Sequence, residues 1–322
     1  MKAVKFKNRN WEVAGILQFP KDFDETKKYP AIVCAHPISS CKEQTAGNIY
    51  GKALAEAGFI TLAFDASNQG ESGGEVRFLE DPATRVEDFR CAADFLTTLN
   101  YVNEEKIGVL GVCGGGGYAA NVAMTERRFK AVVTVVGANY GRLLREGDFS
   151  TDAAIKTLED IAKQRTAQAR GAESAITIYR PNSQEDRKAA GLNDIDLIEA
   201  VDYYQTPRGQ HPNSPNHLRV DSLDKAMAFD AFHLAELLLT QPLHVVVGDK
   251  VGAFGSYRDG LELFGKAASK QKSIQVVHGA SHYDLYDVPQ YTTQALAEII
   301  PFFKKHLNNN FLNQVKVVEK LP

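Results

Sequence analysis

The sequence predicts an α/β fold in which a mostly parallel central sheet is flanked by helices. Three observations lead to this prediction. Short apolar runs alternate with helical patterns, as in successive β-α-β units. Several of these runs are apolar throughout, as expected for strands that are buried on both faces. The chain has 322 residues, enough for one large α/β domain or two small ones.

The elements are expected in a regular order. The first 16 residues suit an antiparallel hairpin at one edge of the sheet. A strand at 31–36 leads to a helix near 46–57, which ends before Gly58. The later elements are a strand at 59–64, a helix at 83–98, strands at 106–110, 131–136, 243–248 and 273–277, and an amphipathic helix near 288–306.

The alternation stops between Val136 and Leu243, where helical, charged and polar segments show no clear strand. A segment of this length between two sheet strands suits a helical lid over one end of the sheet. An added helical layer that only stabilises the fold is the alternative. We therefore expect residues 1–138 and 241–322 to form the core, and residues 139–240 to form a helical cap.

Composition limits the possible settings and partners. A formal net charge of −3 gives no long-range attraction to nucleic acid or to anionic membranes. Four cysteines without a CxxC pair favour neither a zinc site nor a disulfide framework. The start of the chain has no signal-peptide pattern, and no apolar run reaches membrane-spanning length. We expect a cytoplasmic protein without metal or cofactor that acts on a small acyl substrate; a homodimer is compatible with the sequence.

The stretch "VLGVCGGGGY", residues 109–118, is the first candidate functional motif. It suits a phosphate-binding loop, a nucleophile on a strained turn, or an inert core thiol beside a hinge. A dinucleotide site needs a G-x-G-x-x-G loop, usually after the first strand, and an acidic residue about twenty positions later. Here the glycine run follows the fourth or fifth expected strand, and the next strand ends without a carboxylate. The lysine of a P-loop is also missing.

The second interpretation fits the local sequence best. Gly111-Val112-Cys113-Gly114-Gly115 matches a nucleophile elbow with cysteine as the nucleophile. The residues two positions away on either side must be small, because the turn is very tight. The turn also sets the sulfur at a helix N-terminus, where the thiolate is favoured.

A general base is expected after the last strand. His282 follows the strand at 273–277 and a Gly-Ala-Ser loop, which is the position of the histidine in elbow enzymes. His278, at the strand end, suits a structural role. For each of the other histidines taken alone, a structural or solvated role is the better interpretation.

The acid that would orient the histidine is less well defined. It commonly follows the penultimate strand in a G-x-x-D pattern, but Val251 stands at that place. Asp249 is the nearest carboxylate and our candidate, with Asp65 and Asp284 as alternatives. A Cys–His pair depends less on a third member than a Ser–His pair does, because a thiol is more acidic than a hydroxyl.

An oxyanion hole needs two amide donors. The residue after the nucleophile, Gly114, supplies one, and the loop after the early strand supplies the other. Pro37 in that loop has no N–H group, so the amide of Ile38 is the expected second donor.

These motifs resemble the α/β-hydrolase superfamily over almost the whole chain. Within it they are similar to the dienelactone-hydrolase-related branch, whose elbow also carries cysteine. The resemblance rests on "HPISSCKEQ", "FDASNQGESGG", "DPATRVEDFRCAADFL", "GVCGGGGYAA" and "GASHYDLYD", in the family's order. It implies an α/β-hydrolase fold, with Cys113 as nucleophile, His282 as base, and Ile38 and Gly114 as oxyanion donors. Two further segments, "YYQTPRGQHPNSPN" and "GDKVGAFGSYRDG", resemble microbial proteins that include fungal polyketide transferases and thiohydrolases.

Three functions follow from these motifs. The first is a hydrolase that cleaves a carboxylic ester, lactone or thioester through an acyl-enzyme on Cys113. The second is an acyltransferase that uses the same site and replaces water with an alcohol, amine or thiol. The third is a hydrolase-like scaffold that only binds a ligand, a hypothesis favoured by Val251 at the acid position.

Overall fold

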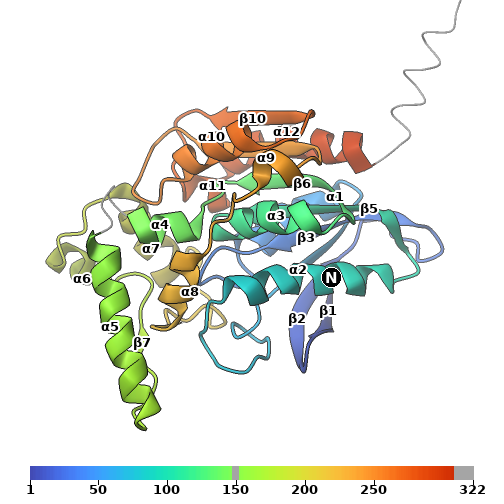
Figure 1. Cartoon of the computed structure of the whole chain (residues 1–322). Helices are drawn as coiled ribbons and strands as arrows, with labels where there is room; N and C mark the ends of the chain where they lie inside the picture. Colours follow the sequence, from blue (N-terminus) through green and yellow to red (C-terminus); the bar gives the residue numbers. More distant parts are fainter. Residues whose placement is uncertain (147–151, 308–322) are drawn as a thin grey trace, which may run out of the picture.

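An eight-stranded sheet forms the centre of the molecule in the computed structural model, which describes residues 1–146 and 152–307 (Figure 1). Its strand order is β1-β2-β4-β3-β5-β6-β9-β10. β2 pairs antiparallel with β1 and β4, and all other pairs are parallel. The predicted sheet and its edge hairpin are therefore confirmed. The strands are β1 (Lys2–Asn8), β2 (Trp11–Gln18), β3 (Tyr29–Ala35), β4 (Ile60–Phe64), β5 (Val102–Val112), β6 (Phe129–Val135), β9 (Leu243–Gly248) and β10 (Lys272–Val277).

The central strands are buried on both faces. In β3, Ala31 and Val33 belong to the hydrophobic core on one side of the sheet, while Ile32 and Cys34 belong to the core on the other side. Successive side chains of a strand point to opposite faces, so a strand between two helical layers must be apolar throughout. This explains the uninterrupted apolar runs in the sequence.

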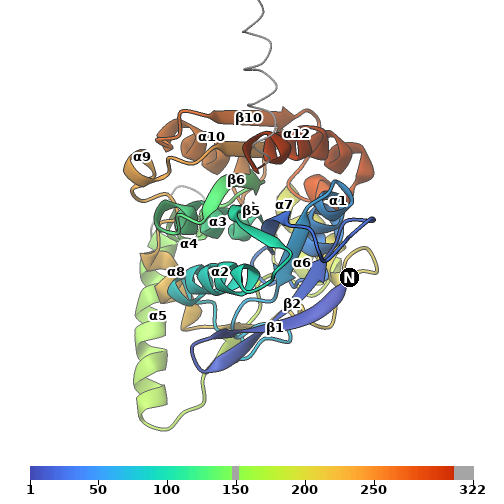
Figure 2. The same cartoon turned by 90° about the vertical axis from the view of Figure 1, so that its right-hand side faces the viewer.

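Helices cover both faces of the sheet. The first core contains side chains of α2, α3 and α10, and the second contains side chains of η1, α1 and α12. Figure 2 shows α2 and α3 on one side of the strands and α1 and α12 on the other. These helices are η1 (Ala46–Gly51, a π-helical turn), α1 (Lys52–Glu56), α2 (Pro82–Thr97), α3 (Gly114–Thr125), α10 (Ser256–Lys266) and α12 (Pro289–Leu307), and the short α11 (Asp284–Asp287) precedes α12.

The segment 139–240, predicted as a cap, adds no strand to the eight-stranded sheet within its described part. Its elements are α4 (Tyr140–Glu146), α5 (Asp152–Ala169), β7 (Ile176–Thr177), α6 (Gln184–Ala189), α7 (Ile195–Gln205), β8 (Leu218–Arg219), α8 (Ser222–Ala228) and α9 (Ala235–Leu238). The sequence showed no clear strand in this segment, but β7 and β8, of two residues each, form a small antiparallel sheet there. Residues 147–151 of the predicted cap and 308–322 of the predicted core lie outside the described residues.

The parts of this segment differ in how closely they pack against the sheet. Helix α5 projects away from the sheet in both views (Figures 1 and 2). By contrast, Phe232, Ala235 and Leu239 are buried in the same core as α3. The last part of the segment therefore packs as part of the sheet core, and the rest of it is called the cap below.

No helix in the described parts of the chain combines the length and the apolar character that crossing a membrane requires.

Candidate active site

Cys113 lies at the sharp turn between β5 and α3. Its backbone has φ 55° and ψ −128°, a conformation that non-glycine residues rarely adopt and that marks a functional constraint. A Cβ atom at Gly111 would lie 2.2 Å from the carbonyl oxygen of Gly115. A Cβ atom at Gly115 would lie 2.6 Å from the carbonyl oxygens of Ala35 and His36. The two glycines thus have the steric role that the sequence predicted for an elbow.

Two backbone amides point at the sulfur of Cys113. They belong to Gly114 and Ile38, and both form hydrogen bonds to the sulfur that lower the pKa of the thiol. Gly114 is the first residue of α3, and Ile38 follows the end of β3, so two neighbouring strands bring the donors together. These are the two amides predicted for an oxyanion hole, and the structure places both beside the sulfur of Cys113.

The hydroxyl of Tyr286 connects Cys113 to His282. It lies 3.3 Å from Nε2 of His282, and it also forms a hydrogen bond with the sulfur of Cys113. Tyr286 is fully buried and stands four residues after His282, in the short helix α11. The thiol and the imidazole, far apart in sequence, therefore lie on two sides of one hydroxyl group.

The other ring nitrogen of His282 faces a hydroxyl group. Nδ1 lies 3.0 Å from Oγ of Ser256, the first residue of α10. The loop before Ser256 is held by the cap: Asp194 accepts a hydrogen bond from the amide of Ala253 (2.9 Å), and Asp196 accepts one from Phe254 (2.8 Å). The N-terminus of α7 thus fixes the segment that orients His282.

Asp249, the predicted acid, is placed elsewhere. Its carboxylate lies 2.5 Å from Nδ1 of His278 and accepts a hydrogen bond from the amide of Gly279 (2.6 Å). Asp249 therefore does not orient His282 in this structure, because the loop after β9 turns the carboxylate toward the end of β10.

The two alternative carboxylates are also occupied. Asp65 is buried and pairs with the ammonium of Lys42 at 2.8 Å. Asp284 accepts a hydrogen bond from the amide of Ser281 (3.0 Å) and pairs with Lys250 at 3.3 Å. Beside Nδ1 of His282, where a carboxylate was expected, the structure has the hydroxyl of Ser256.

Burial determines the protonation of the site. It raises the pKa of the Cys113 thiol to about 11, although hydrogen bonds from Tyr286, Gly114 and Ile38 act in the opposite direction. Burial also lowers the pKa of His282 to about 3. At neutral pH the resting site thus holds a thiol and a neutral imidazole. The helix N-terminus acts in the expected direction, because the amide of Gly114 lowers the pKa of the thiol, but burial outweighs this effect.

Cys113 opens into a cavity of about 310 Å³ between the core and the cap. The core contributes the loop after β3, the turn between β5 and α3, and the aromatic residues after β9 and β10. The cap contributes mostly apolar and aromatic side chains, with one arginine, Arg180. The residues from the cap include Tyr140, Leu143, Leu144, Ile178, Tyr179, Arg180, Ala200, Tyr204, Leu218 and Leu223.

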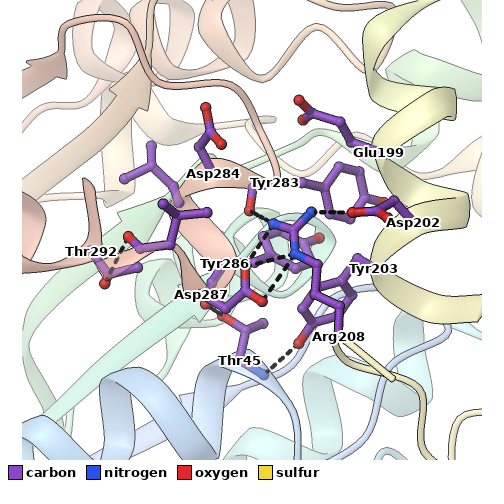
Figure 3. Close-up of polar contacts among 12 residues, drawn as sticks. Thr45, Glu199, Asp202, Tyr203, Arg208, Tyr283, Asp284, Tyr286, Asp287 and Thr292 are labelled. Atoms are coloured by element: carbon purple, nitrogen blue, oxygen red, sulfur yellow. Dashed lines mark hydrogen bonds and ion pairs between the residues drawn. The ribbon is translucent and has the colours of Figure 1, made fainter. Parts of the chain in front are cut away.

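Arg208, from the cap, contacts the segment around α11, which carries Tyr286 and directly follows His282 (Figure 3). Arg208 pairs with Asp287 at 2.7 Å and donates a hydrogen bond to the carbonyl oxygen of Tyr283 (2.9 Å). The hydroxyl of Thr45 donates a hydrogen bond to the carbonyl oxygen of Tyr286 (2.7 Å). Contacts from the cap and from η1 thus hold both ends of α11 in place.

Three potential metal ligands, Cys41, Glu43 and His211, lie close together among the described residues. The ammonium of Lys42 lies 2.6 Å from Glu43. A fixed positive charge at that carboxylate opposes a metal cation there, so we assign no metal to this group.

The sequence did not lead us to predict Tyr286, Ser256 or Arg180 as residues of this site. Tyr286 had only a weak signal, its closeness in sequence to His282, because His282 lies in the turn before α11 and not in the helix. Ser256 had none, since its contact depends on the path of the loop after β9. Arg180 comes from an irregular part of the cap, whose position over the elbow no local pattern specifies.

Comparisons with known proteins agree with this fold. Residues 49–154, which include the elbow, match the model of the prolyl oligopeptidase family. The chain is 41% identical to protein YcjY of Escherichia coli K12 over 94% of this chain and 98% of YcjY. It is 25% identical to the polyketide transferase claH of Penicillium crustosum over 72% of this chain and 74% of claH.

Solved structures with the same fold cover nearly the whole chain. The crystal structure of PA2218 from Pseudomonas aeruginosa has a TM-score of 0.86 at 34% identity and covers 95% of this chain and 93% of PA2218. The crystal structure of the α/β hydrolase GrgF from Penicillium sp. sh18 has a TM-score of 0.76 at 19% identity, over 95% of this chain and 98% of GrgF.

Proposed function

Because this chain belongs to one family with YcjY and has the fold of an α/β hydrolase, we propose that it cleaves a carboxylic ester, lactone or thioester through an acyl-enzyme on Cys113. One observation carries the proposal. The thiol stands on a strained elbow, inside a cavity, with the amides of Ile38 and Gly114 directed at its sulfur. These are the groups that acyl transfer needs: a nucleophile, and two donors for the negative charge on the carbonyl oxygen.

The first step forms a bond between the sulfur of Cys113 and the carbonyl carbon of the substrate. The thiol proton passes to Nε2 of His282 by way of the Tyr286 hydroxyl, which contacts both groups. This hydroxyl donates to the sulfur at rest; it turns its proton toward Nε2, gives it to the imidazole and accepts the thiol proton in its place. The imidazolium then protonates the leaving alcohol or thiol.

The second step releases the acyl group. Water gives a proton to His282 and attacks the thioester carbon, and the sulfur leaves and recovers its proton from the imidazolium. The Ile38 and Gly114 amides bind the oxyanion in both steps. Ser256 accepts the Nδ1 proton of His282 in a hydrogen bond and keeps Nε2 directed at the nucleophile.

Acyl transfer to a second substrate is the alternative for the same site. It is favoured by the apolar and aromatic lining of the cavity, which excludes water from a thioester intermediate. The similarity to the polyketide transferase claH points the same way. The two reactions differ only in whether water or an alcohol, amine or thiol attacks the acyl-enzyme.

Steady-state kinetics with matched aryl esters, lactones and thioesters test the proposal. We expect turnover by the wild type, and a loss of at least about 1000-fold in kcat for Cys113→Ala, since no other group replaces the nucleophile. Cys91→Ala, which removes a partly buried thiol from α2, is the matched control and should keep wild-type rates.

Product analysis separates the alternatives. Free acid alone indicates hydrolysis, whereas an acyl ester, amide or thioester formed with an added acceptor indicates transfer. Equal turnover by Cys113→Ala and the wild type would contradict the mechanism. A complete lack of turnover across the panel, with ligands still binding in the cavity, would favour a scaffold that only binds.

A further inference from the structure

Arg180 is a buried arginine in the wall of the cavity. Its side chain is 5% exposed, and its Nη1 donates a hydrogen bond to Oγ of Ser39 at 2.6 Å. The guanidinium stacks over the ring of Tyr204, 3.8 Å from the ring centroid. Its Nε and Nη2 are buried and have no hydrogen-bond partner among the residues that the structure describes. Two contacts therefore position this side chain, and two donor nitrogens are left over.

No carboxylate balances the charge of Arg180 within the described residues, 1–146 and 152–307. Two other buried arginines do have such partners: Arg85 lies 3.3 Å from Glu80, and Arg142 lies 2.7 Å from Asp259. Around Arg180 the electrostatic neighbours are tyrosines, and burial lowers the pKa of its guanidinium. A buried charge without a partner is costly, so a protein rarely keeps one unless a ligand completes it.

The two unpartnered nitrogens of Arg180 have a fixed relative geometry. Nε–H and Nη2–H lie on the same edge of the planar guanidinium and point in parallel, which matches the two oxygens of a carboxylate. One guanidinium balances one carboxylate charge, whereas a phosphate dianion would leave an excess negative charge in an otherwise apolar cavity.

Arg180 is also close to the chemistry. Ser39, which holds Nη1, directly follows Ile38, the oxyanion donor, and both residues line the cavity together with Cys113. A group bound to the free edge of Arg180 therefore shares the cavity with the acyl group on the sulfur.

We propose that the acyl group of the substrate carries a second, free carboxylate, which Arg180 binds through its Nε–Nη2 edge. The substrate class is then a monoester or monothioester of a dicarboxylic acid. This inference rests on the proposed function and specifies its substrate.

The test compares substrates that differ only in charge. The probes are 4-nitrophenyl monoesters of succinic, glutaric and adipic acid, each paired with the compound whose free carboxylate is replaced by the neutral carboxamide. Rates are corrected for reaction without enzyme, because such monoesters also break down by attack of their own carboxylate. For at least one chain length, we expect the wild type to prefer the acid about 10-fold to 100-fold in kcat/KM.

Variants assign the preference to Arg180. In Arg180→Met the acid-to-amide ratio should fall to about one, and in Arg180→Lys it should be intermediate, because the charge remains without the planar edge. Arg219→Met is the matched control in the cap: Arg219 pairs with Asp221 at 2.7 Å, so its loss should leave the ratio unchanged.

Two outcomes overturn the inference while the proposed function stands. In the first, the wild type turns over the carboxamide esters through Cys113 and prefers none of the free acids. In the second, Arg180→Met keeps the wild-type preference for the acid. Should Arg180→Met fail to fold, the wild-type ratio and Arg180→Lys decide. Calorimetry on Cys113→Ala gives a readout without turnover. Glutarate should bind more tightly than its monoamide, and equal binding by the two contradicts the inference even if no ester is cleaved.

Discussion

Cys113 has a strained backbone conformation, which is typical of a nucleophile, but its thiol stays protonated at neutral pH. Because burial raises its pKa to about 11, the thiol should react slowly with iodoacetamide at pH 7 and increasingly fast up to pH 10. The rate of modification of the Cys113 peptide, followed by mass spectrometry across this pH range, measures the effect. A rate that levels off below pH 8 would show that the thiolate is already the resting form.

Ser256 is the residue in which this site departs most from an acid–base triad. A hydroxyl holds the ring of His282, but it stabilises an imidazolium less than a carboxylate does. Replacing Ser256 with alanine removes one neutral hydrogen bond, worth about 1 kcal/mol, and should lower kcat about fivefold. Burst kinetics with an aryl ester measure this loss; a fall of 1000-fold would mean that Ser256 takes part in the chemistry directly.

At the scale of elements, the elbow depends on how closely α3 approaches the end of β3. A methyl group at Gly115 would meet the carbonyl oxygens of Ala35 and His36, and this backbone can yield only by moving the strand. We expect Gly115→Ala to lower the free energy of unfolding by about 1–3 kcal/mol, as measured by denaturant titration.

The control for this substitution is Gly265 in α10, where an added Cβ meets no atom within 4 Å. Gly265→Ala should be neutral or should stabilise the protein by up to about 1 kcal/mol, because alanine is the better helix former. Equal stability of the two variants would contradict the close approach of α3 and β3.

The elements of the core were predictable because each has a local cause. Strands such as β3 are apolar throughout, since both faces are buried. Helix α2 is capped by Asp81, whose side chain accepts a hydrogen bond from the amide of Ala83 (2.9 Å). The elbow was predictable for the same reason, because its glycines reflect contacts with adjacent backbone. The orientation of His282 and the place of Arg180 depend on long-range packing of the cap, which leaves no local pattern.

Across the whole molecule, buried histidines link stability to pH. Burial lowers the pKa of His244 in β9 to about 4, and its Nδ1 lies 2.8 Å from Oγ of Ser273. Between pH 6.5 and pH 4 the unfolded imidazole binds a proton that the folded one does not, so the free energy of unfolding falls as the pH falls. Raised pKa values of buried carboxyl groups, about 6 at Asp88 and about 7 at Asp196, act in the opposite direction.

The difference in the free energy of unfolding between the wild type and His244→Gln isolates the contribution of His244. From pH 7 to pH 5, the wild type should lose about 2 kcal/mol of stability relative to His244→Gln, as measured by denaturant titration at each pH. A difference that stays constant over this range would show that His244 is equally basic in the folded and unfolded chains.

The most direct test of the account is the intact mass of the protein after incubation with an ester or thioester that it turns over. We predict an added mass equal to the acyl group, carried by the peptide that contains Cys113, longer lived in His282→Ala and absent from Cys113→Ala. Turnover without any such adduct, at a rate that Cys113→Ala retains, would contradict the central claim that this thiol carries the acyl group.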